Sequence, residues 1–450
     1  MAVVLALDIG TSEICALAWD VQERRTIAVR TGANLSTVPG PEGRHEQDPI
    51  TIRAVAIDLL GDLLSTSAVA RDDIRAIAIT GQMHGVLLVD RSLEPLTNLI
   101  TWRDARTTEL ADELVSGLSP GARQSLGCTP APGYGGLTLA WLVRQGRVPR
   151  SGCALGITDY IAASLCGVAS TEPTIAASWG LYDLSSGVWH GETVHRLGVP
   201  ASILPQLQRS GRPLGVLDEA VRLRLDMPPG VTVCAPVGDN QASVLGTGGD
   251  QPGKMSVNIG TGGQVSRVRP QTVAADGIEV RPMPFGGFLH VGASLSAGFA
   301  YAYLAGLFRD AAYELTGETV PLRSIYEKMN EWSGSEAANG LVVHPVFVGT
   351  RLDPAQRGWI RGIDAGNLTP SSLTRAFVEG IVDELRELAT HVGTDGVKGV
   401  IVAGNAVRRN RAFVPIISDR FALPCEVSTD PEEAAVGAAF FCRDVGDVGE

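Results

Sequence analysis

The first eighty residues alternate between short apolar runs and one amphipathic segment. An apolar run at residues 3–7 ends in Asp-Ile-Gly-Thr, and a second run follows at residues 14–19. These runs predict two strands joined as a hairpin around the glycine. Between residues 52 and 64 the apolar positions follow i, i+3, i+4, i+7 spacing, which predicts a helix with one buried face. A further strand is expected at residues 74–80, and this order of elements is typical of an α/β fold.

The second half of the chain repeats this pattern. A run at residues 255–259 leads into Gly-Thr-Gly-Gly, so Ile-Gly-Thr ends a predicted strand in both halves. Thr369 followed by Pro370 predicts a helix start, and Gly393 is a plausible stop. A buried strand is expected at residues 397–402.

The length of the chain and one glycine-rich segment indicate how it is divided into domains. A chain of 450 residues exceeds what one hydrophobic core usually organises, so two domains are expected. Glycine and proline crowd residues 245–254. We therefore predict an N-terminal domain at residues 1–245 and a C-terminal domain at residues 246–450.

Composition narrows the classes of partner. A net charge of -12 argues against nucleic acid, which needs a clustered basic face, but backbone dipoles and a metal can still bind ATP. The seven cysteines form no CxxC pair and suit reduced thiols in a cytoplasmic protein. No apolar run reaches the roughly 18 residues that span a bilayer. We therefore expect a cytoplasmic location and neither a nucleic-acid nor a membrane partner.

Two glycine-threonine turns are candidate phosphate sites. One comprises Gly10, Thr11 and Ser12, and the other begins with Gly260 and Thr261. Glycine lets backbone N–H groups approach a phosphate closely, and a threonine hydroxyl adds a donor. The alternative is that both are ordinary hairpin turns. Neither matches GxxxxGK[ST] or GxGxxG, which removes the support for P-loop and Rossmann folds.

A carboxylate follows the apolar run at residues 231–237. Asp239, in Gly-Asp-Asn-Gln, is placed to accept a proton from a substrate hydroxyl. One aimed carboxylate and Mg²⁺ suffice for phosphoryl transfer, which depends mainly on positioning and charge neutralisation. The alternative is an aspartate that caps the next helix.

Two further segments suit a polyol. Gln82, Met83 and His84 follow a predicted strand, and Trp102, Arg103 and Asp104 add an aromatic face and charges. The alternatives are a structural histidine, a core tryptophan and solvated arginines.

Three motifs in order resemble the superfamily that contains actin, Hsp70 and the sugar kinases. Asp8 to Ser12 resembles its first phosphate motif, Gly260-Thr261 its second, and the segment 404–410 its adenosine motif. Together with Asp239, they resemble the FGGY family of carbohydrate kinases. The resemblance implies two actin-like, ribonuclease H-like α/β domains with a cleft between them, and ATP and Mg²⁺ as cofactors. Cys15 departs from the basic residue that is frequent at its position in the family.

The resemblance also implies roles for individual residues. Asp239 is expected to be the catalytic base, to contact the sugar with Asn240, and to hold Mg²⁺ with Asp8. Gly404, Asn405 and Asn410 are expected to bind ATP with the two turns. A homodimer remains open.

The acceptor is expected to be a ketose. Gly-Gln-Met-His-Gly and the Trp102 segment resemble sugar-binding loops of xylulokinases and sedoheptulokinases. Residues 349–354 depart from the xylulokinase pattern, whereas Gly238–Gln241, residues 367–369 and 430–439 favour sedoheptulokinase, hence phosphorylation of D-sedoheptulose on its terminal hydroxyl. The alternatives are a pentulose kinase such as xylulokinase, an actin-like ATPase that uses no sugar, and a catalytically silent sugar-binding regulator.

Overall fold

The computed structural model describes residues 2–149, 151–273, 277–335, 337–350, 353 and 355–443. Arg351, Leu352 and Pro354 of the segment compared with xylulokinases lie outside the described residues. Contacts divide the chain into two compact units. Unit 1 contains the chain up to Thr247, residues Arg281–Phe288 and the chain from Glu432 onwards; unit 2 contains Gly248–Val280 and Leu289–Pro431.

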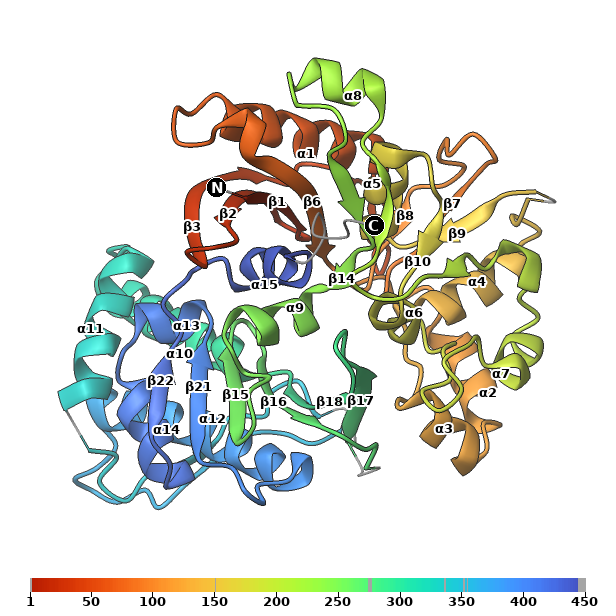
Figure 1. Ribbon diagram of the computed structural model, residues 1–450. Coiled ribbons are helices and arrows are strands. Elements are labelled where there is room, and N and C mark those ends of the chain that lie inside the picture. The colour runs from red at the N-terminus through yellow and green to blue at the C-terminus, as the bar shows by residue number, and fades with distance from the viewer. Residues whose placement is uncertain are drawn as a thin grey trace. The chain divides into compact units, whose positions relative to one another are not determined.

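The central sheet of unit 1 has the strand order β12-β13-β6-β1-β2-β3, with β14 also paired to β6 (Figure 1). The antiparallel hairpin of β1 and β2 confirms the predicted one, with Asp8 opposite Cys15, and β6 runs parallel to β1. The strand bounds are β1 Val3–Ile9, β2 Glu13–Asp20, β3 Arg25–Ala33, β6 Ile74–Gly81, β12 Pro213–Val216, β13 Thr232–Cys234 and β14 Val237–Gly238.

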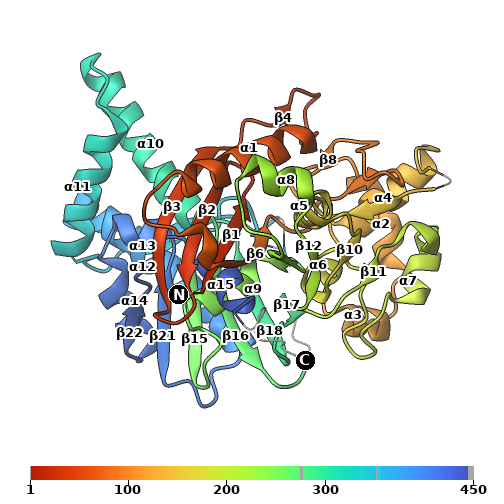
Figure 2. The same cartoon turned by 45° about the horizontal axis from the view of Figure 1, so that its top comes forward.

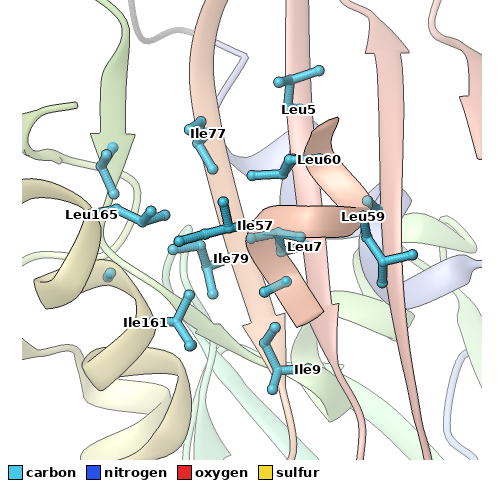
Figure 3. Close-up of a cluster of buried hydrophobic side chains, with 14 of the residues drawn as sticks. Leu5, Leu7, Ile9, Ile57, Leu59, Leu60, Ile77, Ile79, Ile161 and Leu165 are labelled. Carbon is cyan, nitrogen blue, oxygen red and sulfur yellow. The ribbon is translucent and has the colours of Figure 1, made fainter. Parts of the chain in front are cut away.

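One face of this sheet is covered by α1 (Pro49–Leu64) and α5 (Ile157–Cys166). Side chains alternate along a strand, so Leu5, Leu7 and Ile9 all point into this core, which also contains Leu60 (Figure 3). The Asp48 carboxylate caps α1 by accepting backbone N–H bonds, and the apolar side of the helix is buried, which confirms the predicted amphipathic helix. Burying these aliphatic side chains contributes roughly 1.5–3 kcal/mol each.

The opposite face carries two helices that cross closely, α9 (Asp239–Gly246) and α15 (Glu433–Phe441) (Figure 1 and Figure 2). A Cβ added to Gly437 would lie 1.8 Å from the carbonyl oxygen of Ala242. One added to Gly246 would lie 1.9 Å from the carbonyl oxygen of Glu433. Only glycine permits this approach, which places the start of α9 against the sheet face that carries Asp8.

The rest of unit 1 is inserted among these strands, and most of it surrounds a second core. The inserted elements are β4 Thr37–Val38, β5 Glu46–Gln47, β7 Leu87–Val89, β8 Leu99–Ile100, β9 Cys153–Leu155, β10 Ser170–Thr171, β11 Gln206–Leu207, α2 Thr108–Ser116, α3 Pro120–Leu126, α4 Gly135–Arg144, α6 Pro173–Ser178, α7 Gly191–Arg196 and α8 Glu219–Arg224. Val221 of α8 packs instead against the first core. Short 3₁₀ turns occupy Arg71–Asp73 and Ala201–Ile203.

Unit 2 repeats the central topology, with the order β17-β18-β16-β15-β21-β22. β15 pairs antiparallel with β16 and parallel with β21, as β1 does with β2 and β6. The helix α12 starts after Thr369, whose hydroxyl caps it, and ends before Gly393, as predicted. The bounds are β15 Lys254–Ile259, β16 Gly263–Arg269, β17 Ile278–Pro282, β18 Phe288–Ser294, β19 Val342–His344, β20 Trp359–Arg361, β21 Gly399–Ala403, β22 Cys425–Val427, α10 Ala297–Thr316, α11 Leu322–Ser335, α12 Pro370–Val392, α13 Asn405–Arg409 and α14 Phe413–Phe421.

Within the described part of the chain, every helix is too short or too polar to cross a bilayer.

Candidate active site

The turn after β1 is tied to two loops that are distant in sequence. The Thr11 hydroxyl donates to Oε1 of Gln82 (3.1 Å) and accepts from Nε1 of Trp102 (3.0 Å). Gln47 donates to the Thr11 carbonyl (2.9 Å) and accepts from Gln82 (2.7 Å). The structure thus brings the predicted phosphate residue Thr11 together with two predicted sugar residues. Because Thr11 gives its hydroxyl proton to Gln82, its backbone N–H is the donor that remains suited to a phosphate.

Asn34 holds the same turn from the other side. Its side chain donates to the Gly10 carbonyl (2.8 Å) and its backbone N–H donates to the Ser12 carbonyl (2.9 Å). A Cβ on Gly10 would lie 2.5 Å from the Glu13 carbonyl oxygen, so the turn requires glycine. The Ser12 side chain is exposed. The turn is therefore fixed before any ligand binds.

Carboxylates gather beneath the turn. Burial, together with the charges of Asp239 and Glu432, raises the pKa of Asp8 to about 7. Burial raises the pKa of Asp239 to about 6, although Arg281 and the backbone N–H of Asn240 lower it. Asp239 is the first residue of α9, where the helix dipole favours a negative charge, and its side chain is half-buried. At neutral pH it is mostly ionised and able to accept a proton.

The donor set fits Mg²⁺. Asp8 and Asp239 offer the carboxylate oxygens that Mg²⁺ prefers. Burial raises the pKa of both, and neighbouring carboxylates raise that of Asp8 further. A bound cation would stabilise the ionised form of both carboxylates. Among the described residues, no three His, Cys, Asp or Glu side chains gather as a metal-binding group. Mg²⁺ commonly binds through one or two carboxylates together with phosphate oxygens and water.

The loop after β6 approaches Asp239. A Cβ on Gly238 would lie 2.6 Å from the sulfur of Met83, so Met83 packs directly against the residue before Asp239. His84 has a left-handed backbone, with φ of 71°. Its Nδ1 lies 2.7 Å from the Ser178 carbonyl oxygen, which only accepts, so Nδ1 carries a proton. In the neutral ring Nε2 is then the acceptor.

The Trp102 loop is held by a buried ion pair. Arg106 donates to the Asp104 carboxylate (2.6 Å), and both side chains are 1% exposed. The backbone N–H of His45 also donates to Asp104 (2.8 Å). Burial raises the pKa of Asp104, but these hydrogen bonds outweigh it and hold the pKa below its usual range. Asp104 therefore shapes the loop, while Trp102, 45% exposed, offers a ring face beside the Arg103 guanidinium.

Unit 2 presents the second glycine-threonine turn. The carbonyls of Gly260 and Thr261 accept from the backbone N–H groups of Gly298 (3.1 Å) and Phe299 (2.8 Å), at the start of α10. A Cβ on Gly298 would lie 2.1 Å from the Gly260 oxygen. The Thr261 side chain is exposed. The turn is thus fixed by α10 while its threonine remains accessible.

The Ile-Gly-Thr repeat has the same structural setting in both units. A Cβ on Gly81, after β6, would lie 2.5 Å from the carbonyl oxygen of Ile9. A Cβ on Gly404, after β21, would lie 2.5 Å from that of Ile259. Both glycines have positive φ, 156° and 97° respectively. Each unit therefore packs a glycine against the carbonyl that precedes its glycine-threonine turn.

The predicted adenosine residues differ in accessibility. Asn405, the first residue of α13, is exposed. Asn410 is buried, and its amide donates to the Tyr301 hydroxyl (3.1 Å) and the Ser333 hydroxyl (3.0 Å). Its side-chain oxygen accepts from Ala412 N–H (3.0 Å). These bonds use both amide hydrogens, so the side chain of Asn410 holds three segments of unit 2 together.

Three residues of the site were not singled out from sequence. Gln47 and Asn34 lie in polar stretches that carry no motif, so no signal marked them. Glu432 lies within the segment 430–439 that resembled the family, but spacing alone did not indicate that it faces Asp8. Cys15, opposite Asp8, is buried beside Glu432, and burial raises the pKa of its thiol, so it brings no positive charge.

Known proteins and family models match nearly the whole length of this chain. A model of the N-terminal domain of the FGGY family of carbohydrate kinases matches residues 3–246, and a model of its C-terminal domain matches residues 255–442. The xylulose kinase of Staphylococcus xylosus is 27% identical over 453 residues, covering 98% of this chain and 90% of the relative. The sedoheptulokinase of Homo sapiens is 28% identical over 481 residues, covering 97% of this chain and 96% of the relative.

A solved structure shows the same fold. The crystal structure of xylulose kinase from Rhodospirillum rubrum matches with a TM-score of 0.88 and 24% identity, covering 99% of this chain and 91% of that chain. The likeness confirms the predicted fold class of two actin-like, ribonuclease H-like α/β domains.

Proposed function

This chain belongs to the FGGY family of carbohydrate kinases, and we propose that it transfers the γ-phosphoryl group of ATP to the terminal hydroxyl of a ketose. One observation carries the proposal. A half-buried carboxylate, Asp239, starts α9 directly beside the loop of Met83 and His84, and Ser178 holds His84 in place through its Nδ1. A base and a hydroxyl-binding loop are therefore neighbours within unit 1.

Asp239 accepts the proton of the attacking hydroxyl as the oxygen–phosphorus bond forms. Gln82, His84 and Trp102 bind the sugar and hold it against Asp239, with Met83, Arg103 and Asn240 completing its surroundings. Asp104 supports the Trp102 loop through its ion pair with Arg106.

Each unit carries its own candidate contacts to the nucleotide. In unit 1 the turn at Gly10–Ser12 is assigned to phosphate. In unit 2 the turn at Gly260–Thr261 is assigned to phosphate, and Gly404 and Asn405 are assigned to adenosine. Mg²⁺, held by Asp8 and Asp239, neutralises phosphate charge when it is bound.

For the sugar we propose D-sedoheptulose, which would yield sedoheptulose 7-phosphate. The proposal rests on the segments at residues 238–241, 367–369 and 430–439 and is supported by the similarity to sedoheptulokinase. D-xylulose or another pentulose is the alternative, supported by the similarity to xylulose kinase.

A panel of acceptors tests this function. The purified protein is assayed for ADP release with ATP and Mg²⁺, using D-sedoheptulose, D-xylulose, D-ribulose and glycerol in turn. The highest kcat/KM with D-sedoheptulose is expected. A preference for a pentulose overturns the sugar assignment and leaves the kinase intact. ADP release that needs no sugar indicates an ATPase, and sugar binding without any ADP release indicates a silent regulator.

A further inference from the structure

A chain of buried hydrogen bonds ends on the residue before Asp239. Glu172, fully buried, caps α6 and accepts from the Ser210 hydroxyl (2.6 Å), the Ile175 backbone N–H (3.0 Å) and the Thr174 hydroxyl. The Thr174 oxygen in turn accepts from the backbone N–H of Gly238 (2.8 Å). Glu172 thus receives donors from α6 and from the segment that contains Ser210, and it holds Thr174 in one orientation.

The direction of these bonds follows from the chemistry of the groups. Burial raises the pKa of the Glu172 carboxyl, and its hydrogen bonds oppose that rise. The Thr174 hydroxyl donates to Oε1 of Glu172, the same oxygen that accepts from the Ile175 N–H. The lone pairs of Thr174 then remain for the Gly238 N–H. Because Gly238 immediately precedes Asp239, this arrangement fixes the backbone from which the carboxylate of Asp239 projects.

The other end of the same helix holds the Met83–His84 loop. Ser178, the last residue of α6, accepts from the backbone N–H of His84 at its hydroxyl (3.0 Å). Its carbonyl oxygen lies 2.7 Å from His84 Nδ1. The left-handed backbone of His84 is therefore held by two bonds to a single residue.

We propose that α6 sets the spacing between the base and the sugar-binding loop, with Glu172 and Thr174 positioning Asp239 and with Ser178 positioning His84. The inference rests on the proposed function, because it assigns Asp239 and His84 their roles. Phosphoryl transfer depends on alignment, and a displacement of about 1 Å can lower the rate roughly a hundredfold. Six residues of helix, anchored at both ends, keep such displacements small.

The first test separates positioning from stability. Thr174→Val keeps the shape of the side chain and removes the hydroxyl, and Thr174→Ser keeps the hydroxyl. We expect kcat to fall at least about tenfold in the valine variant, with the ketose KM within about threefold of wild type, and to recover in the serine variant.

Thr193 provides a matched control. It is 1% exposed, lies in the first turn of the six-residue helix α7, and its hydroxyl bonds the cap residue His190 (2.8 Å). Thr193→Val therefore removes an equivalent bond remote from Gly238 and should leave kcat unchanged. Where Thr174→Val does not fold, Glu172→Gln tests the same chain, because an amide can donate to Thr174 and compete with Gly238 N–H.

The second test concerns the other end of α6. Ser178→Ala removes the acceptor for His84 N–H, and we expect the ketose KM to rise about fivefold with a smaller change in kcat. Ser164→Ala is the control. The Ser164 hydroxyl donates to the backbone carbonyl three residues earlier (2.8 Å), and the Ser178 hydroxyl makes the same kind of bond (2.7 Å). It should leave both constants unchanged.

The outcomes distinguish the two proposals. Equal kcat in Thr174→Val and Thr193→Val, with Asp239→Asn inactive, overturns the positioning role and leaves the base in place. Near-normal turnover in Asp239→Asn overturns the proposed function itself.

Discussion

The hydroxyl of Thr11 donates a hydrogen bond to the side-chain oxygen of Gln82, which lies 71 residues later in the chain, over 3.1 Å. The same hydroxyl accepts from the indole of Trp102 (3.0 Å). The turn assigned to phosphate and the loops assigned to sugar are therefore joined at a single oxygen atom. A change at Thr11 should consequently reach the acceptor side of the site.

We predict that Thr11→Val raises the ketose KM about tenfold, because two side-chain bonds of about 1 kcal/mol each are lost and Gln82 and Trp102 become less restrained. Thr11→Ser keeps the hydroxyl and should stay within about threefold of wild type. Steady-state kinetics with ketose varied at saturating ATP measures the difference. Equal KM values in the two variants would show that the hydroxyl does not organise the acceptor loops.

Asp8 should make stability depend on pH. Its pKa of about 7 lies above the roughly 3.9 of a carboxyl in an unfolded chain, so the folded protein holds a proton that the unfolded chain releases. Raising the pH from 4 towards 7 therefore destabilises the wild type. Asp8→Asn lacks this effect and should be more stable at pH 8 by about 1–3 kcal/mol in EDTA, with a smaller gain at pH 5.

Thermal unfolding at both pH values, with EDTA or Mg²⁺, checks this expectation. Mg²⁺ should stabilise the wild type more than Asp8→Asn at pH 8. A stability difference between the proteins that does not change with pH would contradict the raised pKa of Asp8.

The buried ion pair beneath the Trp102 loop should matter more than an exposed one. Arg106→Met leaves the carboxylate of Asp104 without its cation, and we expect a loss of about 3–5 kcal/mol. Arg144→Met breaks the exposed pair with Glu113 and should leave stability nearly unchanged, because solvent screens that pair. Urea unfolding followed by tryptophan fluorescence compares the two. Similar losses in both variants would count against the buried pair as the anchor of the loop.

The crossing of α9 and α15 should tolerate no side chain at Gly437. Gly437→Ala introduces a Cβ that would lie 1.8 Å from the Ala242 carbonyl oxygen, so the helices must separate. We expect a loss of about 1–3 kcal/mol and a lower kcat, because α9 begins with Asp239. In Gly306→Ala the new Cβ meets no atom within 4 Å, and this helical site should gain about 0.5–1 kcal/mol. Thermal unfolding and kcat of both variants decide whether the contact, rather than the substitution itself, is responsible.

Sequence patterns predicted those helices and strands whose formation depends on residues close together in the chain. The β1–β2 hairpin, α1 and α12 follow from periodicity, capping residues and glycine stops, which all lie within a few residues of one another. The apolar run at residues 231–237 does not form one continuous strand: β13 and β14 are separated by Ala235 and Pro236. Proline has no N–H for a strand ladder, which accounts for the break.

Long-range packing was beyond the reach of the sequence. The alanine-rich helix α15 is buried on several sides, so its pattern does not indicate that it covers the sheet of unit 1. Asp104 and Asn410 have the residue types of a binding site, yet their side chains bond other parts of the protein. Thr174 and Ser178 acquire their proposed role only because Gly238 and His84 fold against them.

The kinetics of Asp239→Asn test the central claim most directly. The substitution preserves shape and removes the proton acceptor, and a positioned base contributes roughly 10²–10⁴-fold to the rate. Asp218→Asn is the matched control, because Asp218 also lies at the start of a short helix, α8, which its carboxylate caps. We predict that kcat falls about a thousandfold in Asp239→Asn, with the ketose KM nearly unchanged, while Asp218→Asn keeps wild-type turnover. A kcat in Asp239→Asn close to that of Asp218→Asn would contradict the account.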